Sequence, residues 1–513
     1  MFANEISSVA LGEKPVTITE FVAVARYHAR VEFTESYVDI VRASRALIER
    51  FLAENRLIYG VTTGFGDNFT EVIAPGDAAE LQANIVRSHA VSVGEPLSGE
   101  VVRAIWLMEL IGLGKGYSGT GPDTLELIRT LLNADVIPYV PGEGSVGYLG
   151  PEAHMALLLI GEGRAWLGGE LLDGAEVLRR VGARPIRFGC KEGLSLTNGT
   201  HSVTAIGVLA AHDASLAGQT ADIAAGLSLQ ALKGTVRALD PRLHAVKRHP
   251  EQAGVAANLR RITENSPLSE EFLDYRLQDT YSLRGIPQMH GGAKRALNQA
   301  WTVVEEELDS VGDNPIIVPE DGDGIALMGA NFDSTYVGIQ SDAMANALTV
   351  LAKIAERRTD RMVNSNFSEL PAFLAPNPGL HNGFMIAQYT SAALSMDLQG
   401  MAGPASARTV PTSANQEDPV SNAYSAALTA YRAAGKLGYI LAIELLCAAQ
   451  AFDLLAPRRP SPVSEAVKEL IRSAAPEVTG DRAFHGDIEA IREFVRHGKV
   501  LRTVEARTGP LEC

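Results

Sequence analysis

Three polar side chains in turn-rich stretches of this sequence have the chemistry that acid–base catalysis or carboxylate binding requires. Tyr59 begins the glycine-rich stretch YGVTTGFG, and a phenol can act as a base once it has lost its proton. Arg284 carries a planar fork of donors that fits a carboxylate bidentately. Asn198, in the turn LTNGT, can donate a hydrogen bond to developing negative charge. Each has a plainer interpretation: a packed loop tyrosine, an arginine paired with a nearby Asp, and an ordinary turn residue.

Nucleotide, metal and hydrolase motifs receive little support. Gly142, Gly144 and Gly147 spell GxGxxG, but Pro138 and Pro141 interrupt the segment that should be the preceding strand. None of the 11 histidines belongs to an HExxH or other zinc spacing, and no GxSxG is present.

Most of the histidines are expected to be ordinary surface residues. His244 and His249 are examples.

Composition favours a soluble protein of the cytoplasm. The formal net charge of the 513 residues is −16, and no Lys/Arg run is dense enough to neutralise a phosphate backbone, so nucleic acid is a poor partner. Cys190, Cys447 and Cys513 are far apart and form no CxxC pair, which suits a reducing compartment. The first residues lack the pattern of a secretory leader, and no window supplies 18 uninterrupted apolar residues, so we expect no membrane association.

Helical periodicity dominates the elements that must position these side chains. An apolar face recurs between Val337 and Ala355, and the Ala- and Leu-rich stretches 202–232 and 422–455 are typical of helices surrounded by other helices. We therefore predict a mainly α fold with a long-helix bundle core. The turn-rich stretches that punctuate it are 59–66, 142–151, 196–200, 312–315 and 408–419. The predicted segments are an N-terminal lobe at 1–200, a central helical bundle at 201–456 and a C-terminal helical region at 457–513.

Six segments occurring in one order resemble the histidine and aromatic amino acid ammonia-lyase family. The first is YGVTTGFG, which is similar to the loop that carries the family's catalytic tyrosine. The others are SHA at 88–90, GSVG at 144–147, KEGLSLTNGT at 191–200, QDTYSLR at 278–284 and PTSANQED at 411–418. Further matches are GDNP at 312–315, GANF at 329–332, NPGLHNGFMIAQ at 377–388 and AIELLCAAQAFDL at 442–454. Such density of agreement is not expected by chance.

The resemblance implies a homotetramer of mainly helical subunits, an active site assembled from three subunits, and a small amino acid substrate. It also implies the prosthetic group methylidene-imidazolone (MIO), formed when an Ala-Ser-Gly tripeptide cyclises. This chain departs from the pattern, because Gly147 is followed directly by Tyr148 where the family has the tripeptide and then Asp. Either the chain has lost its electrophile, or the written sequence omits a fused residue that has no standard letter. The gap matches the tripeptide in length and position, so we expect the tripeptide to be encoded there. Tyr148 itself is a separate departure.

The resemblance also assigns roles to individual residues. Tyr59 is the expected base, and Tyr281 and Asn198 are the expected hydrogen-bond donors to MIO or to the substrate's polar head. Arg284 is expected to clamp the substrate carboxylate, and Gln278 to orient it. Gly147, Tyr148, Asn198 and Phe332 are expected to adjoin MIO.

The substrate is predicted from two side chains that are expected to face its ring. Ser88-His89 is similar to histidine lyases, although the same pair occurs in tyrosine aminomutases. Glu417 would favour an imidazole N–H and penalise a phenyl ring. L-histidine, giving urocanate, is therefore the predicted substrate. Several residues are atypical of the resemblance, so a tyrosine or phenylalanine ammonia-lyase, or a 2,3-aminomutase, remains an alternative. These residues are Tyr148, His201, Thr120-Gly121-Pro122 and Asp397. If the gap after Gly147 is genuine, a non-catalytic homologue of the same fold becomes the alternative.

Overall fold

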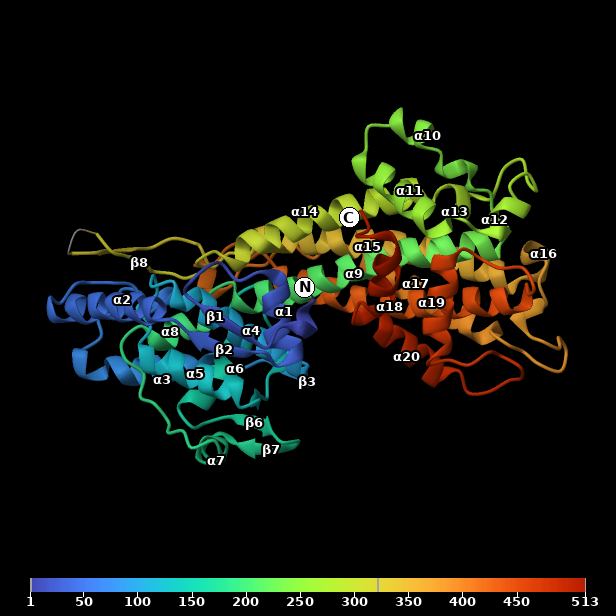
Figure 1. Cartoon of the computed structure of the whole chain (residues 1–513). Helices are drawn as coiled ribbons and strands as arrows, with labels where there is room; N and C mark the ends of the chain where they lie inside the picture. Colours follow the sequence, from blue (N-terminus) through green and yellow to red (C-terminus); the bar gives the residue numbers. More distant parts are fainter. Residues whose placement is uncertain (1, 321–322, 513) are drawn as a thin grey trace. The chain divides into compact units, whose positions relative to one another are not determined.

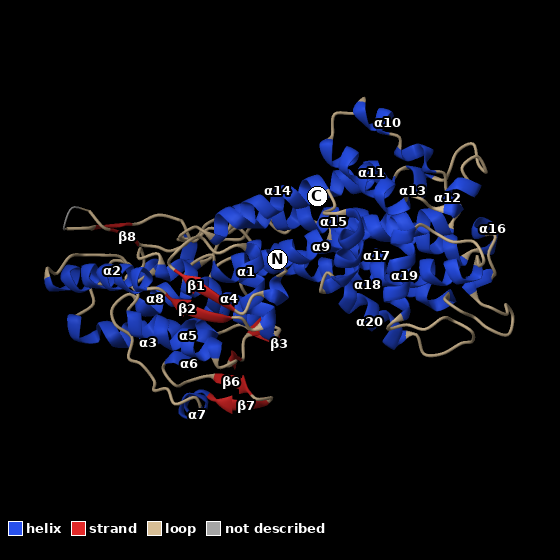
Figure 2. Ribbon diagram, viewed as in Figure 1, coloured by secondary structure: helices blue, strands red, loops and turns tan. Residues whose placement is uncertain are grey.

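The chain forms two compact units that are each assembled from three stretches of sequence. The computed structural model describes residues 2–320 and 323–512 (Figure 1). The first unit comprises Met1–His212, Trp301–Ser341 and Pro404–Leu428, and the second comprises Asp213–Ala300, Asp342–Gly403 and Thr429–Cys513. Helices are the main element of both (Figure 2), which confirms the predicted mainly α fold. The three consecutive segments predicted from the sequence stay a prediction.

Helix α4, Gly99–Gly114, is the centre of the first unit. Every residue from Val101 to Gly114 is buried, because the helix is apolar on nearly all sides and other helices surround it. The hydroxyl of Tyr37, on α2 (Glu35–Ala53), donates to the carbonyl of Leu110 at 2.7 Å and fixes α2 against α4. The other helices that lie wholly in this unit are α1 Ile18–Tyr27, α2 Glu35–Ala53, α3 Ala78–His89, α5 Pro122–Asn133, α6 Pro151–Leu159, α7 Gly174–Arg180 and α8 Glu192–Thr197.

All strands of the described residues belong to the first unit, and they are short. Strands β1, Ser8–Leu11, and β2, Arg30–Phe33, pair in parallel with Ser8 opposite Arg30. The remaining pairs are antiparallel: β3 Val93–Pro96 with β5 Pro141–Glu143, β4 Ile137–Pro138 with β6 Arg164–Leu167, β6 with β7 Glu170–Asp173, and β8 Ile316–Val318 with β9 Ile325–Leu327. Because β5 pairs antiparallel with β3, the GxGxxG stretch does not follow a strand of a parallel sheet.

Four long helices provide residues to both units. They are α9 His201–Ala231, α14 Ile286–Leu308, α15 Thr335–Val363 and α18 Ala423–Leu454. Helices α15, α9 and α18 confirm the helices predicted over 337–355, 202–232 and 422–455, respectively. The apolar face predicted on α15 is confirmed at Val337, Met344, Leu348, Leu351 and Ala355, each with no exposed surface. Helix α18 is long and apolar enough to cross a membrane, but 83% of its most apolar window is buried inside the protein, which is typical of a core helix.

The second unit has a buried polar network at its centre. Asp222 accepts hydrogen bonds from Nδ1 of His290 at 2.8 Å and Nζ of Lys294 at 2.6 Å. Arg358 forms a bidentate ion pair with Glu444, and all five side chains are nearly or completely buried. The other helices of this unit are α10 Pro241–Ala245, α11 Pro250–Thr263, α12 Pro267–Glu271, α13 Tyr281–Arg284, α16 Ser365–Ser368, α17 Met385–Met401, α19 Pro462–Arg472, α20 His485–Arg496 and α21 Lys499–Thr508.

His244 is not the surface residue that the sequence suggested. Its side chain is 2% exposed, Nε2 lies 3.1 Å from the carbonyl oxygen of Ala238, and Nδ1 lies 2.9 Å from Nε2 of Gln252. The prediction was wrong because short-range polarity does not reveal that α11 packs against this residue. His249 is exposed, as predicted.

Candidate active site

The loop that begins at Tyr59 connects α2 to α3 and is tied to α8 by one buried side chain. Gln82 on α3 donates from Nε2 to the carbonyl of Gly60 at 3.3 Å, and its Oε1 accepts the N–H of Leu194 at 3.0 Å. Gly60 has φ +63°, and a Cβ there would lie 2.4 Å from a methyl carbon of Leu194. A glycine is therefore required at this close approach.

Tyr59 is half-buried, and its surroundings oppose ionisation of the phenol. Its hydroxyl accepts the backbone N–H of Gly66 at 2.9 Å. Burial raises the pKa of Tyr59, the Gly66 N–H lowers it, and the negative charge of Glu417 raises it further. Burial therefore outweighs the one backbone donor, and the phenol form of Tyr59 is favoured.

His89 ends α3 with a defined ring orientation. Its Nδ1 lies 2.8 Å from the carbonyl oxygen of Ile85, and a carbonyl can only accept, so Nδ1 carries the proton. Burial lowers the pKa of His89, so its ring is neutral and Nε2 presents a lone pair. The ring contacts Phe65, in the Tyr59 loop, edge-on at 6.2 Å between centroids.

Glu417 lies in a short turn that follows the 3-10 helix Ser413–Asn415. Its backbone carbonyl accepts the N–H of Thr412 at 2.8 Å, and Oε2 lies 3.5 Å from Oγ1 of Thr412. The half-buried carboxylate acts electrostatically on both Tyr59 and Tyr148. The structure therefore brings together three of the predicted residues from sequence positions up to 358 apart.

The turn 147–150 leads into α6 and packs closely in the first unit. The N–H of Gly147 donates to Oγ of Ser145 at 3.3 Å, and its carbonyl accepts from Oγ of Ser334 at 3.0 Å. Tyr148 is 5% exposed, and its ring lies edge-on to Phe332 with 4.8 Å between centroids. Burial raises the pKa of Tyr148 to about 12. Phe332 is thus in contact with the residue that follows Gly147.

Asn198 ends α8 and is held by the loop 312–315. Its Nδ2 lies 3.4 Å from Oδ1 of Asp313 and 3.3 Å from the carbonyl oxygen of Asn314. Asp313 is 2% exposed and pairs at 2.5 Å with Nζ of Lys191, which has no exposed surface. Lys191 also donates to Oγ of Ser195 at 2.9 Å. This buried ion pair fixes the position of the Asn198 side chain.

The remaining three predicted residues lie in the second unit and are exposed. Tyr281 begins α13 with 58% of its surface exposed, and the Arg284 guanidinium carbon lies 5.3 Å from the centre of its ring. Nε of Arg284 donates to the backbone carbonyl of Asp279 at 3.1 Å. Among the described residues Arg284 forms no ion pair with a carboxylate, so the pairing with an Asp is not observed. Gln278 is exposed next to them.

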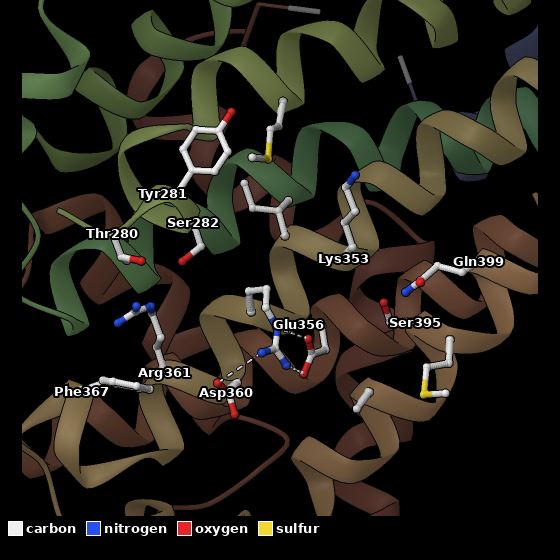
Figure 3. A pocket seen from close by; sticks show the side chains of 15 residues that line it. Thr280, Tyr281, Ser282, Lys353, Glu356, Asp360, Arg361, Phe367, Ser395 and Gln399 are labelled. Carbon is white, nitrogen blue, oxygen red and sulfur yellow. Dashed lines mark hydrogen bonds and ion pairs between the residues drawn. The ribbon is translucent and has the colours of Figure 1, made fainter.

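A cavity of about 780 Å³ adjoins Tyr281 within the second unit. Figure 3 shows Thr280, Tyr281 and Ser282 on one side, and Lys353, Glu356, Asp360 and Arg361 projecting from α15. Such a volume accommodates an amino acid. Of the predicted site residues it includes Tyr281 alone.

Sequence reasoning missed the residues that hold the functional side chains in place. Gln82 and Ser334 were not predicted, because a buried amide or hydroxyl has no distinctive local pattern. Lys191 and Thr412 lie in the matched segments 191–200 and 411–418, but no role was predicted for either. Asp313 lies in the GDNP segment, and that match was the available signal. No group of three or more His, Cys, Asp or Glu in the described residues is placed to hold a metal ion.

The surroundings of residue 147 fit an MIO group only in part. Asn198 and Phe332 are present as neighbours that could hold it. However, the 513 residues contain no Ala-Ser-Gly, and the Tyr148 ring itself packs against Phe332. A Cβ at Gly147 would lie 2.3 Å from Oγ of Ser421, so the turn is tightly packed.

Comparison with known proteins gives a consistent result over nearly the whole chain. Residues 16–473 match the family described as aromatic amino acid lyase. A histidine ammonia-lyase of Symbiobacterium thermophilum is 44% identical over 99% of this chain and 100% of its own. The crystal structure of histidine ammonia-lyase from Trypanosoma cruzi matches with a TM-score of 0.91 and 36% identity, covering 98% of this chain and 96% of its own. Tyrosine aminomutase from Streptomyces globisporus matches with a TM-score of 0.92 and 33% identity, covering 98% and 100%. The chain therefore belongs to the aromatic amino acid lyase family.

Proposed function

We propose that this family member removes ammonia from L-histidine to give urocanate. The observation that supports histidine as the substrate is the half-buried carboxylate of Glu417, which acts electrostatically on Tyr59 and Tyr148. In the part of the chain that the structure describes, Glu417 forms no ion pair with Lys, Arg or His. An imidazole N–H would compensate this charge, whereas an apolar phenyl ring would leave it desolvated. The Nε2 lone pair of His89 is a second acceptor for a substrate N–H. Relatives that carry the name histidine ammonia-lyase support the proposal.

The remaining residues take roles that follow from their chemistry. Tyr59 accepts the β-proton, and Asn198 and Tyr281 donate hydrogen bonds to developing charge. Arg284, which is exposed and bound to no carboxylate in the described chain, clamps the substrate carboxylate with its planar fork, while Gln278 orients it.

MIO is the proposed prosthetic group, formed from an Ala-Ser-Gly tripeptide encoded between Gly147 and Tyr148. Gly147, Tyr148, Asn198 and Phe332 would adjoin it. When bound, MIO supplies the electrophile that no ordinary side chain provides. The substrate is a free amino acid, and the protein acts in the cytoplasm as a homotetramer without nucleic acid or membrane partners. We propose that the two groups of site residues come from different subunits of this tetramer.

Replacing Glu417 with Gln tests the substrate directly. Glu417→Gln keeps an acceptor but removes the charge, so kcat/KM for histidine should fall while phenylalanine and tyrosine are handled relatively better. Leaving a buried acceptor without its donor costs roughly 1–3 kcal/mol, so the wild-type protein should prefer histidine over phenylalanine by at least about tenfold. The ratio of the two kcat/KM values is the quantity to measure. Asp418→Asn, at the exposed neighbouring carboxylate, is the matched control and should leave that ratio unchanged.

Aromatic substrates are the alternative within the same chemistry. The likeness to a tyrosine aminomutase supports a tyrosine or phenylalanine ammonia-lyase, or a 2,3-aminomutase. Faster turnover of tyrosine or phenylalanine than of histidine, or a β-amino acid product, would replace histidine by this alternative.

A non-catalytic homologue is the second candidate, and one structural observation favours it. The direct link from Gly147 to Tyr148 is part of a closed turn in which Oγ of Ser145 accepts the N–H of Gly147 and donates to the carbonyl of Tyr148, both at 3.3 Å. The ring of Tyr148, which follows Gly147 directly, also packs on Phe332.

Intact-protein mass spectrometry distinguishes the two candidates. We expect a mass that exceeds that of the 513 residues by Ala, Ser and Gly residues less two water molecules. Sequencing the gene across the codons for Gly147 and Tyr148 is the control. If the two codons are adjacent and the mass is unmodified, the protein has no tripeptide from which the electrophile could form. The chain would then be a non-catalytic member of the family.

A further inference from the structure

Three titratable side chains are buried in the interior of the first unit, outside the residues assigned above. They are Glu109 on α4, Glu152 in the first turn of α6, and His201 at the start of α9. Their exposed fractions are 1%, 0% and 2%. The charge of Glu152 acts on the carboxyl of Glu109, although 43 positions separate the two residues in the sequence.

Glu152 connects the starts of two helices. Its Oε1 accepts the backbone N–H of Ser202 at 2.9 Å. That N–H belongs to the first turn of α9, where helix geometry leaves donors without a partner. A side chain from the first turn of α6 therefore caps α9.

His201 occupies space that two glycines provide. A Cβ at Gly112 on α4 would lie 3.0 Å from Nε2 of His201, and a Cβ at Gly199 would lie 3.0 Å from Nδ1. Gly199 has φ +131°, a conformation that L side chains rarely adopt. The ring is thus held between α4 and the turn that follows Asn198.

Several polar atoms of this cluster are buried without a hydrogen-bond partner among the described residues. They are Oε1 of Glu109, Oε2 of Glu152 and Nδ1 of His201. Neither glutamate forms an ion pair with Lys or Arg in the described chain. Burying an ionised carboxylate without a cation is costly, and such a group takes up a proton instead.

The charges around the cluster do not change this result. Asp313 acts on His201, but its own charge is paired with Lys191 at 2.5 Å. Glu307 on α14 interacts with Thr200, and burial raises its pKa. On α6, Nε2 of His154 accepts the N–H of Ser92, which makes that ring neutral. On α4, Arg103 is directed to the carbonyls of Val24 and Leu132 and to Asp135, rather than to the cluster.

We propose that Glu109, Glu152 and His201 form a buried acid–base cluster that keeps both carboxyls neutral near pH 7 and positions the two turns of the candidate active site, 147–150 and 198–200. The positioning role rests on the proposed function, because Tyr148 and Asn198 belong to those turns. Glu152 follows the first turn closely in sequence, and its cap on Ser202 fixes the helix that follows the second. Both turns contain glycines with positive φ, Gly147 and Gly150 in one and Gly199 in the other, so the cap restrains otherwise adaptable backbone.

The pH dependence of stability tests the neutral carboxyls. Burial raises the pKa of both Glu109 and Glu152, so the folded chain holds protons that the unfolded chain releases above the ordinary glutamate pKa. Their stabilising contribution is therefore complete at acid pH and is lost as pH rises toward the folded-state pKa values. Burial lowers the pKa of His201 to about 4, so its contribution is lost in the opposite direction, as pH falls toward 4.

Glu109→Gln and Glu152→Gln should each reduce the protons taken up on folding by about one above pH 6. Their melting temperatures should then fall less steeply than that of the wild-type protein between pH 6 and 9. Glu95→Gln, at an exposed glutamate of β3, is the matched control and should follow the wild-type curve. Wild-type slopes in both cluster variants would overturn the proposal. If these variants do not fold, infrared spectroscopy of the wild-type protein decides the matter. A protonated-carboxyl band should persist at pH 8, and its absence would equally overturn the proposal.

Amide hydrogen exchange tests the positioning role without relying on turnover. Glu152→Ala should accelerate exchange at Ser202 and in the turns 147–150 and 198–200 by about tenfold or more, whereas Glu152→Gln keeps the acceptor and should restore wild-type exchange. Equal exchange in Glu152→Ala and wild-type protein at these amides would refute positioning by Glu152. If the wild-type protein does not act on histidine, the proposed function fails, while exchange and stability still decide the cluster.

Discussion

At the residue scale, Tyr59 shows how packing can oppose the chemistry expected of a side chain. The N–H of Gly66 favours the phenolate, but burial and the nearby Glu417 carboxylate favour the phenol, and the pKa of Tyr59 is raised. A phenol in this state acts as a base chiefly at alkaline pH, or when a cation enters the site.

Tyr59→Phe should therefore lose turnover while keeping the fold. We expect kcat on histidine to fall by at least about a hundredfold with little change in substrate affinity, because one hydroxyl is removed and packing is retained. In the wild-type protein kcat/KM should rise with pH above neutrality, since the base form requires deprotonation of a phenol with a raised pKa. Steady-state kinetics against pH measure both effects, with Tyr117→Phe as the control. A kcat close to that of the wild-type protein would exclude Tyr59 as the base.

At the element scale, the position of Asn198 depends on a buried ion pair between two segments. Lys191 immediately precedes α8, and Asp313 lies in the loop between α14 and β8; both side chains are almost completely buried. A buried pair is a weak source of net stability, but removing one partner leaves an uncompensated charge in the interior. The pair therefore holds the loop against α8 and holds the Asn198 side chain with it.

Asp313→Asn should destabilise the first unit by about 3–5 kcal/mol, because Lys191 is left buried without an anion. Urea denaturation monitored by circular dichroism measures the loss. Asp309→Asn removes the carboxylate that pairs with Lys115 on the surface. This change should lower the free energy of unfolding far less, because solvent screens exposed pairs. Equal losses in the two variants would show that the Lys191–Asp313 pair has no special role.

At the scale of the whole molecule, α17 carries an apolar face that the described residues of the chain leave exposed. Ile386, Tyr389 and Met396 are 56%, 63% and 70% exposed, and their spacing of three and seven residues places them on one side of the helix. Aligned apolar side chains on a soluble surface are typical of a protein–protein contact. This face supports the proposed homotetramer.

Light scattering after size exclusion should give a mass about four times that of the 54.7 kDa chain. Met396→Asp should shift the protein to smaller species, because it places a charge within the apolar face. Val246→Asp, at another exposed apolar residue, should leave the mass unchanged. A wild-type protein that stays monomeric at micromolar concentration would contradict the tetramer.

Patterns along the sequence were enough to predict the helical architecture and the family. Apolar residues at helical spacing between Val337 and Ala355 predicted the buried face of α15, because periodicity is a local property that short stretches of chain express. Ordered motifs from Tyr59 to Glu417 indicated the family without any knowledge of contacts.

Which of these side chains are neutral, paired or capped depends on how the helices pack together. The raised pKa of Tyr59, the burial of His244, the Lys191–Asp313 pair and the effect of Glu152 on Glu109 all depend on residues distant in sequence. The ionisation of a side chain is set by what packs around it, through desolvation and nearby charges. That environment comes into existence when the helices pack together, so no local pattern in the sequence could specify it.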